Sequence, residues 1–336
     1  MKRIQISAAV GLTLTMAALL LKVPAMAQIE APLVLEMTIP LPDVRGRIDH
    51  MALDRGRQRL FVAALGNNTV EVIDIQSGKR IGRIEGLDEP QGVGYLENLD
   101  IIVVANAGDG SVRLFKSSDL SPVGRIDLRD DADNIRIDPR NGNILVGYGH
   151  GGLAIVDPRE RALIRTIPLA RHPEGFQVDA ATARVFVNVP DAAQIDVVDL
   201  DIGRQITSWK VAGLRGNFPI ALDSKQALLA TVFRNPPTLV LLDTTAGAVK
   251  ARLPVCGDAD DVFFDARRDR IYVSCGGGEI AIFQRNGKSY NLAASVKTSS
   301  GARTSLFAPE LDRLFVAVRA GLLQSDAAID VYRPVP

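Results

Sequence analysis

A short motif that returns at intervals of 41 to 44 residues is the strongest constraint on how this chain can fold. In each copy an apolar residue and an aspartate precede a polar turn and then an apolar run, as in Leu53-Asp54 and residues 59–63. The aspartates of this motif are Asp54, Asp138, Asp179, Asp223 and Asp265. Repetition at such a period is typical of folds built from one supersecondary unit, so the repeat decides the fold class.

A second column of aspartates keeps the same register. Asp74, Asp157, Asp199 and Asp243 follow the first four aspartates by 19 or 20 residues. Two further copies keep only the apolar run, at residues 101–104 and 314–317, which brings the number of units to seven. Both columns stand ahead of polar turns, where a short acidic side chain can bond the backbone two residues on. We therefore interpret these aspartates as turn formers and exclude them from any site.

Each unit has the pattern of four short antiparallel strands. Runs of four to seven residues rich in Val, Ile, Leu and Phe are separated by Gly, Asn, Asp and Pro, and helix signals are absent. Four strands in a repeat of this length are typical of a β-propeller blade. The last unit has only three strands, whereas residues 33–39 form an apolar strand outside any unit. The sequence therefore predicts an all-β, seven-bladed propeller over residues 28–336, a single domain whose N-terminal strand closes the last blade.

The first 27 residues are expected to be a cleaved signal peptide. Lys2 and Arg3 precede an uncharged stretch at residues 8–21, and Ala25-Met26-Ala27 fits a cleavage site. The stretch of 14 residues is shorter than the roughly 20 that span a bilayer as a helix. We therefore expect a periplasmic monomer without a membrane anchor.

Charge and composition exclude several classes of protein. The chain is 47% hydrophobic and 23% charged, which excludes a disordered or collagen-like protein. It has 39 basic and 39 acidic residues, and loss of residues 1–27 removes three basic ones, leaving 36 against 39. Because general nucleic-acid binders carry a basic excess, nucleic acid is an improbable partner.

The strand runs also resemble those of a known family. Residues Leu60-Phe61-Val62-Ala63, Val185-Phe186-Val187-Asn188 and Tyr272-Val273-Ser274-Cys275 resemble the repeat of the YVTN-repeat family, the exported YncE-like seven-bladed propellers, with a more distant similarity to gluconolactonase-like propellers. The resemblance implies the propeller fold and export. It does not imply one activity, because members of such folds do different things.

The start of each unit varies in a way that the blade does not require. Five residues before the first aspartate column the chain enters the innermost strand, at the mouth of the central channel. The seven units carry Asp49, Pro90, Asp133, Glu174, Phe218, Asp260 and Arg303 there. The next position carries His50, Gln91, Asn134, Gly175, Pro219, Asp261 and Thr304. All three histidines, His50, His150 and His172, fall in loops expected on this face, so we expect it to hold the site.

Three interpretations of this charged ring stay open. It can be a solvated rim of acids paired with arginines, which contributes little energy. It can bind a cation, with Asp133, Asn134, Asn217 and Asp261 as oxygen ligands suited to Ca²⁺, whereas histidine ligands would favour a transition metal. It can also hold an anionic group on arginines such as Arg303.

We predict a binding protein whose channel mouth recognises a small polar ligand or a periplasmic partner protein, with Ca²⁺ or another divalent metal as a possible cofactor. The predicted ligand-binding residues are Asp49, His50, Gln91, Asn134, His172, Glu174, Asn217, Asp260, Asp261 and Arg303. The alternative is a metal-dependent hydrolase similar to lactonase-like propellers. In that enzyme a cation would polarise the carbonyl and His50 or His172 would activate water as the catalytic residue.

The two cysteines allow two interpretations. Cys256 precedes the sixth unit and Cys275 ends its second strand, so both are expected near the same face. In an exported chain such a pair favours a disulfide. A Cys-His nucleophile is the alternative, but the sequence offers it no orienting partner.

Overall fold

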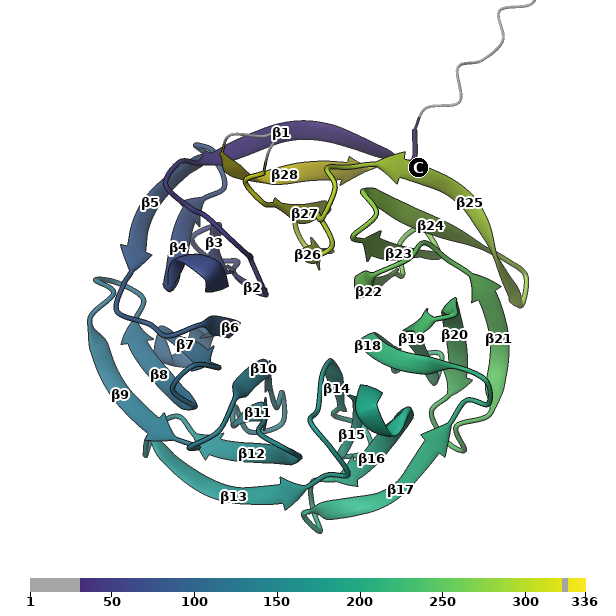
Figure 1. Ribbon diagram of the computed structural model, residues 1–336, viewed down its shortest axis with the longest axis horizontal. Coiled ribbons are helices and arrows are strands. Elements are labelled where there is room, and N and C mark those ends of the chain that lie inside the picture. The colour runs from purple at the N-terminus through teal and green to yellow at the C-terminus, as the bar shows by residue number, and fades with distance from the viewer. Residues whose placement is uncertain (1–30, 322–325) are drawn as a thin grey trace, which may run out of the picture. The chain divides into compact units, whose positions relative to one another are not determined.

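The structure, a computed structural model, describes residues 31–321 and 326–336. It contains seven four-stranded antiparallel sheets, which are arranged as blades around a central channel (Figure 1). The predicted signal peptide, residues 1–27, lies outside the described residues. No helix in the described part of the chain is long and apolar enough to cross a bilayer.

The blades follow one another along the chain, and each runs from the innermost strand outward. Blade 1 has β2 (Met51–Asp54), β3 (Arg59–Ala64), β4 (Thr69–Asp74) and β5 (Lys79–Ile84). Blade 2 has β6 (Pro90–Leu96), β7 (Ile101–Asn106), β8 (Ser111–Lys116) and β9 (Pro122–Asp127). Blade 3 has β10 (Ala132–Ile137), β11 (Ile144–Tyr148), β12 (Gly152–Asp157) and β13 (Ala162–Pro168). Blade 4 has β14 (Phe176–Asp179), β15 (Arg184–Val189), β16 (Gln194–Asp199) and β17 (Arg204–Lys210).

Blade 5 has β18 (Arg215–Asp223), β19 (Leu228–Asn235), β20 (Pro237–Asp243) and β21 (Val249–Pro254). Blade 6 has β22 (Ala259–Asp265), β23 (Arg270–Cys275), β24 (Glu279–Asn286) and β25 (Ser289–Lys297). Blade 7 has β26 (Ser305–Ala308), β27 (Arg313–Val318), β28 (Ala327–Pro334) and β1 (Leu33–Leu41). The only helical segments among the described residues are the 3₁₀ turns η1 (Leu65–Asn67), η2 (Glu97–Leu99) and η3 (Pro190–Ala192).

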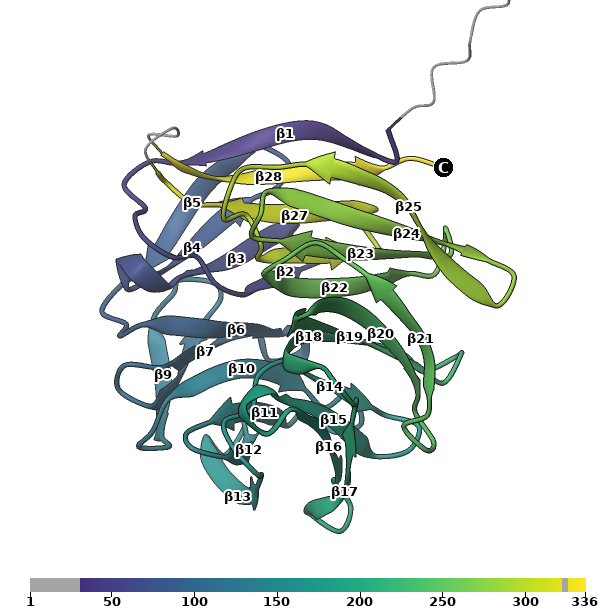
Figure 2. The ribbon, with the colours of Figure 1, turned by 45° about the vertical axis from the view of Figure 1, so that its right-hand side comes forward.

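The N-terminal strand closes the ring, as the sequence predicts. β1 pairs antiparallel with β28, from Leu33 opposite Pro334 to Leu41 opposite Ala327. Figures 1 and 2 both show β1 along the outer edge of blade 7. The strand extends two residues beyond the predicted end at Ile39. Closure of this kind joins the two ends of the described chain in one sheet, so no blade is left incomplete.

The hydrophobic core consists of layers between neighbouring blades. Phe186 of blade 4 and Phe233 of blade 5 are completely buried in one such layer, and Phe61 lies in the layer between blades 1 and 2. Since each blade has two apolar faces, it can bury them only against its neighbours. This explains why the apolar runs of the second and third strands are nearly continuous rather than alternating.

The repeated aspartates form turns, as predicted. In the first column, the Asp138 carboxylate accepts a hydrogen bond from the backbone N–H of Arg140 at 3.0 Å. In the second, Asp199 accepts one from the N–H of Asp201 at 2.9 Å. Asp54, Asp74 and Asp223 instead accept a bond from the N–H three residues on, and Asp54 also holds the Arg59 guanidinium. These residues therefore belong to the fold and leave the mouth of the channel as the variable region.

Candidate functional site

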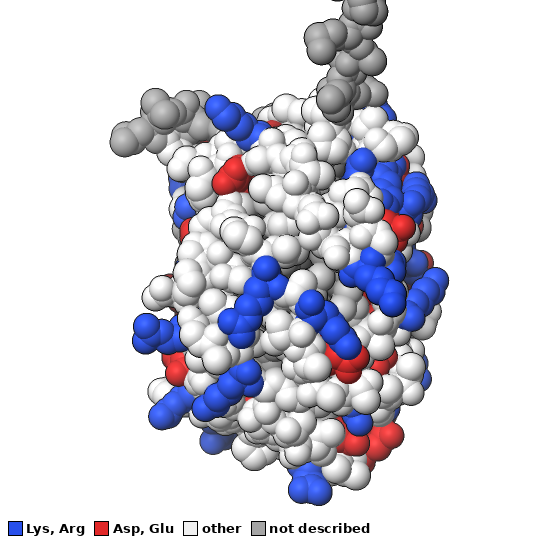
Figure 3. All heavy atoms as spheres, turned by 90° about the vertical axis from the view of Figure 1, so that its right-hand side faces the viewer, with Lys and Arg blue, Asp and Glu red and all other residues white. Residues whose placement is uncertain are grey.

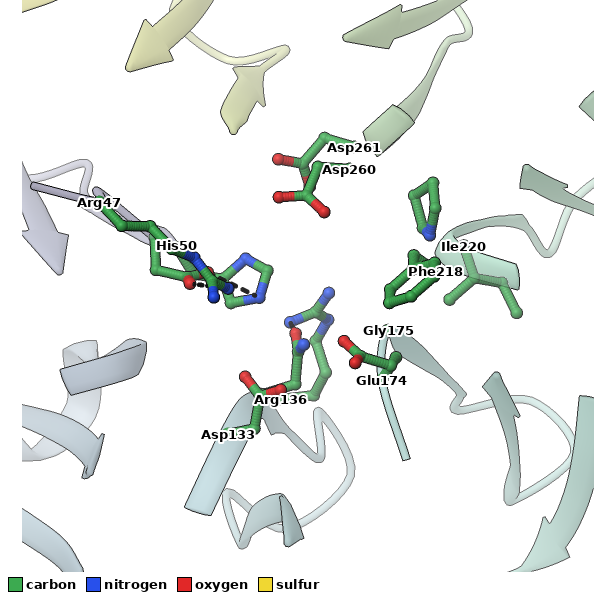
Figure 4. A pocket seen from close by; sticks show the side chains of 13 residues that line it. Arg47, His50, Asp133, Arg136, Glu174, Gly175, Phe218, Ile220, Asp260 and Asp261 are labelled. Carbon is green, nitrogen blue, oxygen red and sulfur yellow. Dashed lines mark hydrogen bonds and ion pairs between the residues drawn. The ribbon is translucent and has the colours of Figure 1, made fainter. Parts of the chain in front are cut away.

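A small polar cavity lies at the channel mouth, where the innermost strands begin. Its volume is about 30 Å³, enough for a metal ion or a few waters. Seven predicted residues line it, namely Asp49, His50, Asp133, Asn134, Glu174, Asp260 and Asp261. Figure 4 shows side chains from several blades converging on this point. The residues that break the repeat are therefore brought together.

Irregular strand starts position these side chains. In blade 3 the pairing register of β10 with β11 shifts between Ala132 and Ile135. In blade 6 the register of β22 shifts between Ala259 and Asp261. A bulge lets consecutive side chains depart from strict alternation and re-aims them. Asp133 and Asn134, and likewise Asp260 and Asp261, can thus both line the same cavity.

Arginines compensate two of the carboxylates. Arg47 Nη2 lies 2.5 Å from the Oδ2 atom of the buried Asp49. Asp260 is held by Arg234 at 2.5 Å and by Arg303 at 3.2 Å. Burial raises the pKa of Asp49, and the neighbouring His50 and Arg47 oppose that rise. Part of the charged ring is thus a set of ion pairs, as the rim interpretation expects.

Asp133 and Glu174, which line the cavity, form a group with His172. One potential metal-ligand atom from each of the three residues lies within 4.8 Å of the others. His172 Nδ1 donates a hydrogen bond to the carbonyl oxygen of Gly149 at 2.6 Å. Nε2 lies 3.6 Å from Asp133 Oδ2. Burial alone would lower the pKa of His172, but the hydrogen bonds and the charge of Asp133 outweigh it and raise the pKa to about 9.

Two carboxyl groups of the mouth hold their protons unusually tightly. Burial, with repulsion from Asp133, raises the pKa of Glu174 to about 8. Burial also raises the pKa of Asp261 to about 7, although the nearby His50 opposes the shift. Of the residues that the structure describes, none donates a hydrogen bond to the Glu174 carboxylate. A carboxylate removed from water without a donor or cation stays protonated or attracts a cation.

Four of the predicted ligand-binding residues do not line the cavity: Gln91, His172, Asn217 and Arg303. Gln91 lies beside it, where its amide nitrogen contacts Asp131 at 3.3 Å. Arg303 binds Asp258 and Asp260 at the rim. His172 reaches the mouth through Asp133 and does not line the cavity itself. The catalytic roles predicted for His50 and His172 stay predictions.

Asn217 is the fourth predicted residue outside the cavity lining. It is fully buried, and its amide nitrogen donates to Asn188 Oδ1 at 2.8 Å and to the Gln194 carbonyl at 2.9 Å, whereas its Oδ1 atom has no hydrogen-bond partner among the described residues. These bonds hold the start of blade 5 against blade 4. Of the predicted oxygen ligands, Asp133, Asn134 and Asp261 line one cavity, and the ligand role of Asn217 stays a prediction.

Sequence reasoning missed Arg136, which lines the cavity from β10. Its Nη1 atom donates to Asn134 Oδ1 at 3.2 Å and to the Ile135 carbonyl at 2.7 Å. The sequence contains a signal for it, because the equivalent position of the other units carries no charge: Ala52, Val93, Gln177, Ala221, Phe263 and Leu306.

A disulfide joins Cys256 to Cys275 in the structure, with their Cα atoms 5.9 Å apart. It ties the loop before β22 to the end of β23. That loop also carries Asp258, which lies 2.6 Å from Arg303 Nη1. The bond therefore anchors one side of the channel mouth. With both sulfur atoms joined, neither is a free nucleophile in this structure.

Comparisons with known proteins bear on the fold of this chain and not on its activity. No protein-family model matches the chain, and no curated protein matches it by sequence. A solved chain of Kuenenia stuttgartiensis hydrazine synthase is similar with a TM-score of 0.73 at 15% identity, over 85% of this chain and 96% of that one. A chain in the crystal structure of a mitotic checkpoint complex is similar with a TM-score of 0.76 at 14% identity, over 96% of this chain and 99% of that one. Since identities this low show the fold alone, the comparisons support the β-propeller fold and no particular activity.

Proposed function

We propose that the protein is an exported binding propeller that holds a divalent cation at its channel mouth through Asp133, His172 and Glu174. The observation that carries the proposal is the meeting of one imidazole and two carboxylates with ligand atoms within 4.8 Å. His172 and Glu174 come from the loop that leads from blade 3 into blade 4, and Asp133 comes from β10 of blade 3, so the ring itself assembles the group.

The orientation of His172 supports metal binding. Histidines that ligate metals commonly donate their other ring N–H to a carboxylate or a backbone carbonyl, which fixes the tautomer. The bond from Nδ1 to the Gly149 carbonyl does this and directs Nε2 toward Asp133. A cation here would compensate Glu174, which has no arginine within ion-pair distance among the described residues.

The ligand types favour a transition metal over calcium. Ca²⁺ takes six to eight oxygen ligands, whereas zinc and manganese accept a mixture of imidazole and carboxylate. Asn217, a predicted oxygen ligand, does not line the cavity, which leaves Ca²⁺ fewer oxygen ligands there. We therefore expect Zn²⁺ or Mn²⁺ to bind more tightly than Ca²⁺.

Isothermal titration of the metal-stripped protein with Zn²⁺, Mn²⁺ and Ca²⁺ tests the proposal. The wild type should bind one equivalent of Zn²⁺ or Mn²⁺, and His172→Gln and Glu174→Gln should each weaken binding by tenfold or more. His150→Gln is the matched control, because His150 lies on the same face but is 98% exposed and pairs with Asp130. Absence of metal binding, or an equal loss in the control, would contradict the proposal.

Export belongs to the same proposal. Disulfides persist in oxidising compartments such as the periplasm, so the Cys256–Cys275 bond supports a location outside the cytosol. Fractionation of cells that express the full chain, with N-terminal sequencing of the product, should find the protein in the periplasm beginning at Gln28. Recovery of an intact N-terminus from the cytosol would contradict export.

A further inference from the structure

A second cavity lies in the channel behind the mouth, and it differs from the mouth in size and chemistry. Its volume is about 350 Å³, within the range of small-molecule sites. His50, Arg136 and Asp261 line both cavities and thus separate them. The larger cavity is lined by many apolar side chains of the innermost strands, among them Leu53, Val93, Ile135, Ile137, Phe263 and Leu306.

Several of these apolar side chains are left partly exposed where they line the channel. Leu53, Ile137, Phe263 and Leu306 pack on the core clusters with one side and line the cavity with the other. For Phe263 and Leu306 the fold does not require this, because Gln177 occupies the equivalent position of blade 4. An apolar wall around a space of this size favours a ligand with an apolar body.

Arg136 supplies a cation at the end of this cavity nearest the mouth. The other three arginines of the mouth each have a carboxylate close by, at 2.5 Å for Arg47, 2.5 Å for Arg234 and 3.2 Å for Arg303. Arg136 forms no ion pair with the described residues, although Asp261 and Asp133 act on it at longer range and its guanidinium lies 5.6 Å from the centre of the Phe176 ring. Its hydrogen bonds to the described residues use Nη1 alone, with Asn134 and Ile135 as acceptors. Figure 4 shows the guanidinium extending toward the middle of the channel.

The cavity shares Tyr95 and Ile137 with a further cavity on the opposite face of the ring, among the turns that follow the innermost strands. Arg55, Arg140 and Arg159 line that further cavity together with Glu97 and Asp138, which form ion pairs with Arg55 and Arg140.

We propose that the channel binds a small monocarboxylate with an apolar body, its carboxylate on Arg136 and its body against Leu53, Ile137, Phe263 and Leu306. A guanidinium presents two parallel N–H donors to a carboxylate, which fits the free side of Arg136. The proposal does not depend on metal at the mouth, because none of the three proposed metal ligands lines the larger cavity.

Calorimetric titration with butanoate, hexanoate and hexanamide in the presence of a chelator tests this site. Hexanoate should bind about fourfold more tightly per methylene than butanoate, the ratio that corresponds to about 0.8 kcal/mol for each buried methylene. Hexanamide, which has the same body without the charge, should bind at least tenfold more weakly than hexanoate. Because metal is absent, this result is independent of the cation proposal.

Variants separate the two parts of the site. Arg136→Gln should remove the preference for hexanoate over hexanamide and keep the dependence on chain length. Leu306→Trp, which fills the cavity and leaves Arg136 in place, should abolish binding of both, and it covers the case in which Arg136→Gln fails to fold. Arg252→Gln, on the exposed outer strand β21, is the control and should bind as the wild type does. Equal binding of the acid and the amide by the wild type, no gain with chain length, or full hexanoate binding by both site variants would each overturn the proposal.

Discussion

At the scale of single residues, Asp261 shows how the channel mouth sets protonation. The carboxylate accepts the backbone N–H of Ser305 at 2.7 Å, and no arginine of the described chain forms an ion pair with it. Asp260, directly before it, takes both Arg234 and Arg303. Two consecutive aspartates on β22 therefore differ in charge compensation. One is neutralised by arginines, whereas burial raises the pKa of the other to about 7.

This difference predicts a pH-dependent stability. With a folded pKa of about 7 against 3.8 unfolded, the native state holds more protons between these values, so stability contributed at Asp261 is lost as pH rises. Asp261→Asn removes that loss and keeps an acceptor for Ser305. We expect the variant to match the wild type near pH 4 and to exceed it by about 1–3 kcal/mol at pH 8. Denaturant unfolding at both pH values measures this, with the exposed Asp191→Asn as control. A difference that is constant with pH would contradict the account.

At the scale of elements, the disulfide clamps a loop whose carboxylates hold two arginines of the mouth. Cys275 is completely buried at the end of β23, and Cys256 lies in the loop before β22. Asp258, the last residue of this loop, and Asp260, in β22, form ion pairs with both Arg303 and Arg234. The disulfide therefore has two effects. It restricts the unfolded chain, and in the folded protein it fixes the loop whose carboxylates pair with the arginines of the mouth.

Removal of this bond should destabilise the protein. The cysteines are separated by 19 residues, for which chain entropy gives about 3 kcal/mol. The double variant Cys256→Ala/Cys275→Ala should lose about that much free energy of unfolding. Addition of reductant should lower the melting temperature of the wild type and leave the double variant unchanged. Two titratable thiols in the unreduced, unfolded wild type would show that the bond does not form in the exported protein.

The elements of the fold could be predicted from the sequence, because the repeat reports them several times over. Each of the seven units supplies independent evidence for strands and turns, so an irregular unit such as residues 101–104 does not disturb the assignment. The direction of a given side chain at the mouth, by contrast, depends on a single unit, so the repeat provides no second copy from which to predict it. Asn217 and Asp261 occupy starts of innermost strands that both contain a register shift, yet one amide is buried between blades and one carboxylate lines the cavity. Such local irregularity has no counterpart elsewhere in the sequence.

At the scale of the whole ring, the charges are separated between channel and wall. The outer strands of blades 4 to 6 (β17, β21 and β25) carry Arg204, Lys210, Lys250, Arg252 and Lys297 and no acidic residue. Figure 3 shows Lys and Arg in excess on this side of the ring. Acidic side chains, by contrast, gather at the channel mouth. A cation that reaches the mouth therefore meets carboxylates there and not on this part of the wall.

Strand β1 contributes to the core layers on both sides of blade 7 and so closes the ring. Ile39 and Leu41 of this strand are completely buried in a cluster with Ala327 and Ile329 of β28. Without β1 this apolar surface and the hydrogen-bonding edge of β28 would be exposed, and exposed edges promote association between chains. A chain that begins at Pro42 should therefore unfold at a lower temperature, with a broader transition, and should aggregate. Differential scanning calorimetry and gel filtration measure both effects.

A synthetic peptide of residues 31–42, added to the shortened chain, provides the control. It should restore the sharp transition, because pairing of β1 with β28 requires only that the strand be present and not that it be joined to β2. A peptide with Ile39→Asp and Leu41→Asp should fail, since both side chains enter the buried cluster. If the shortened chain melted at the same temperature and as sharply as the full chain, the seven blades would be stable without β1, which would contradict the proposed role of ring closure.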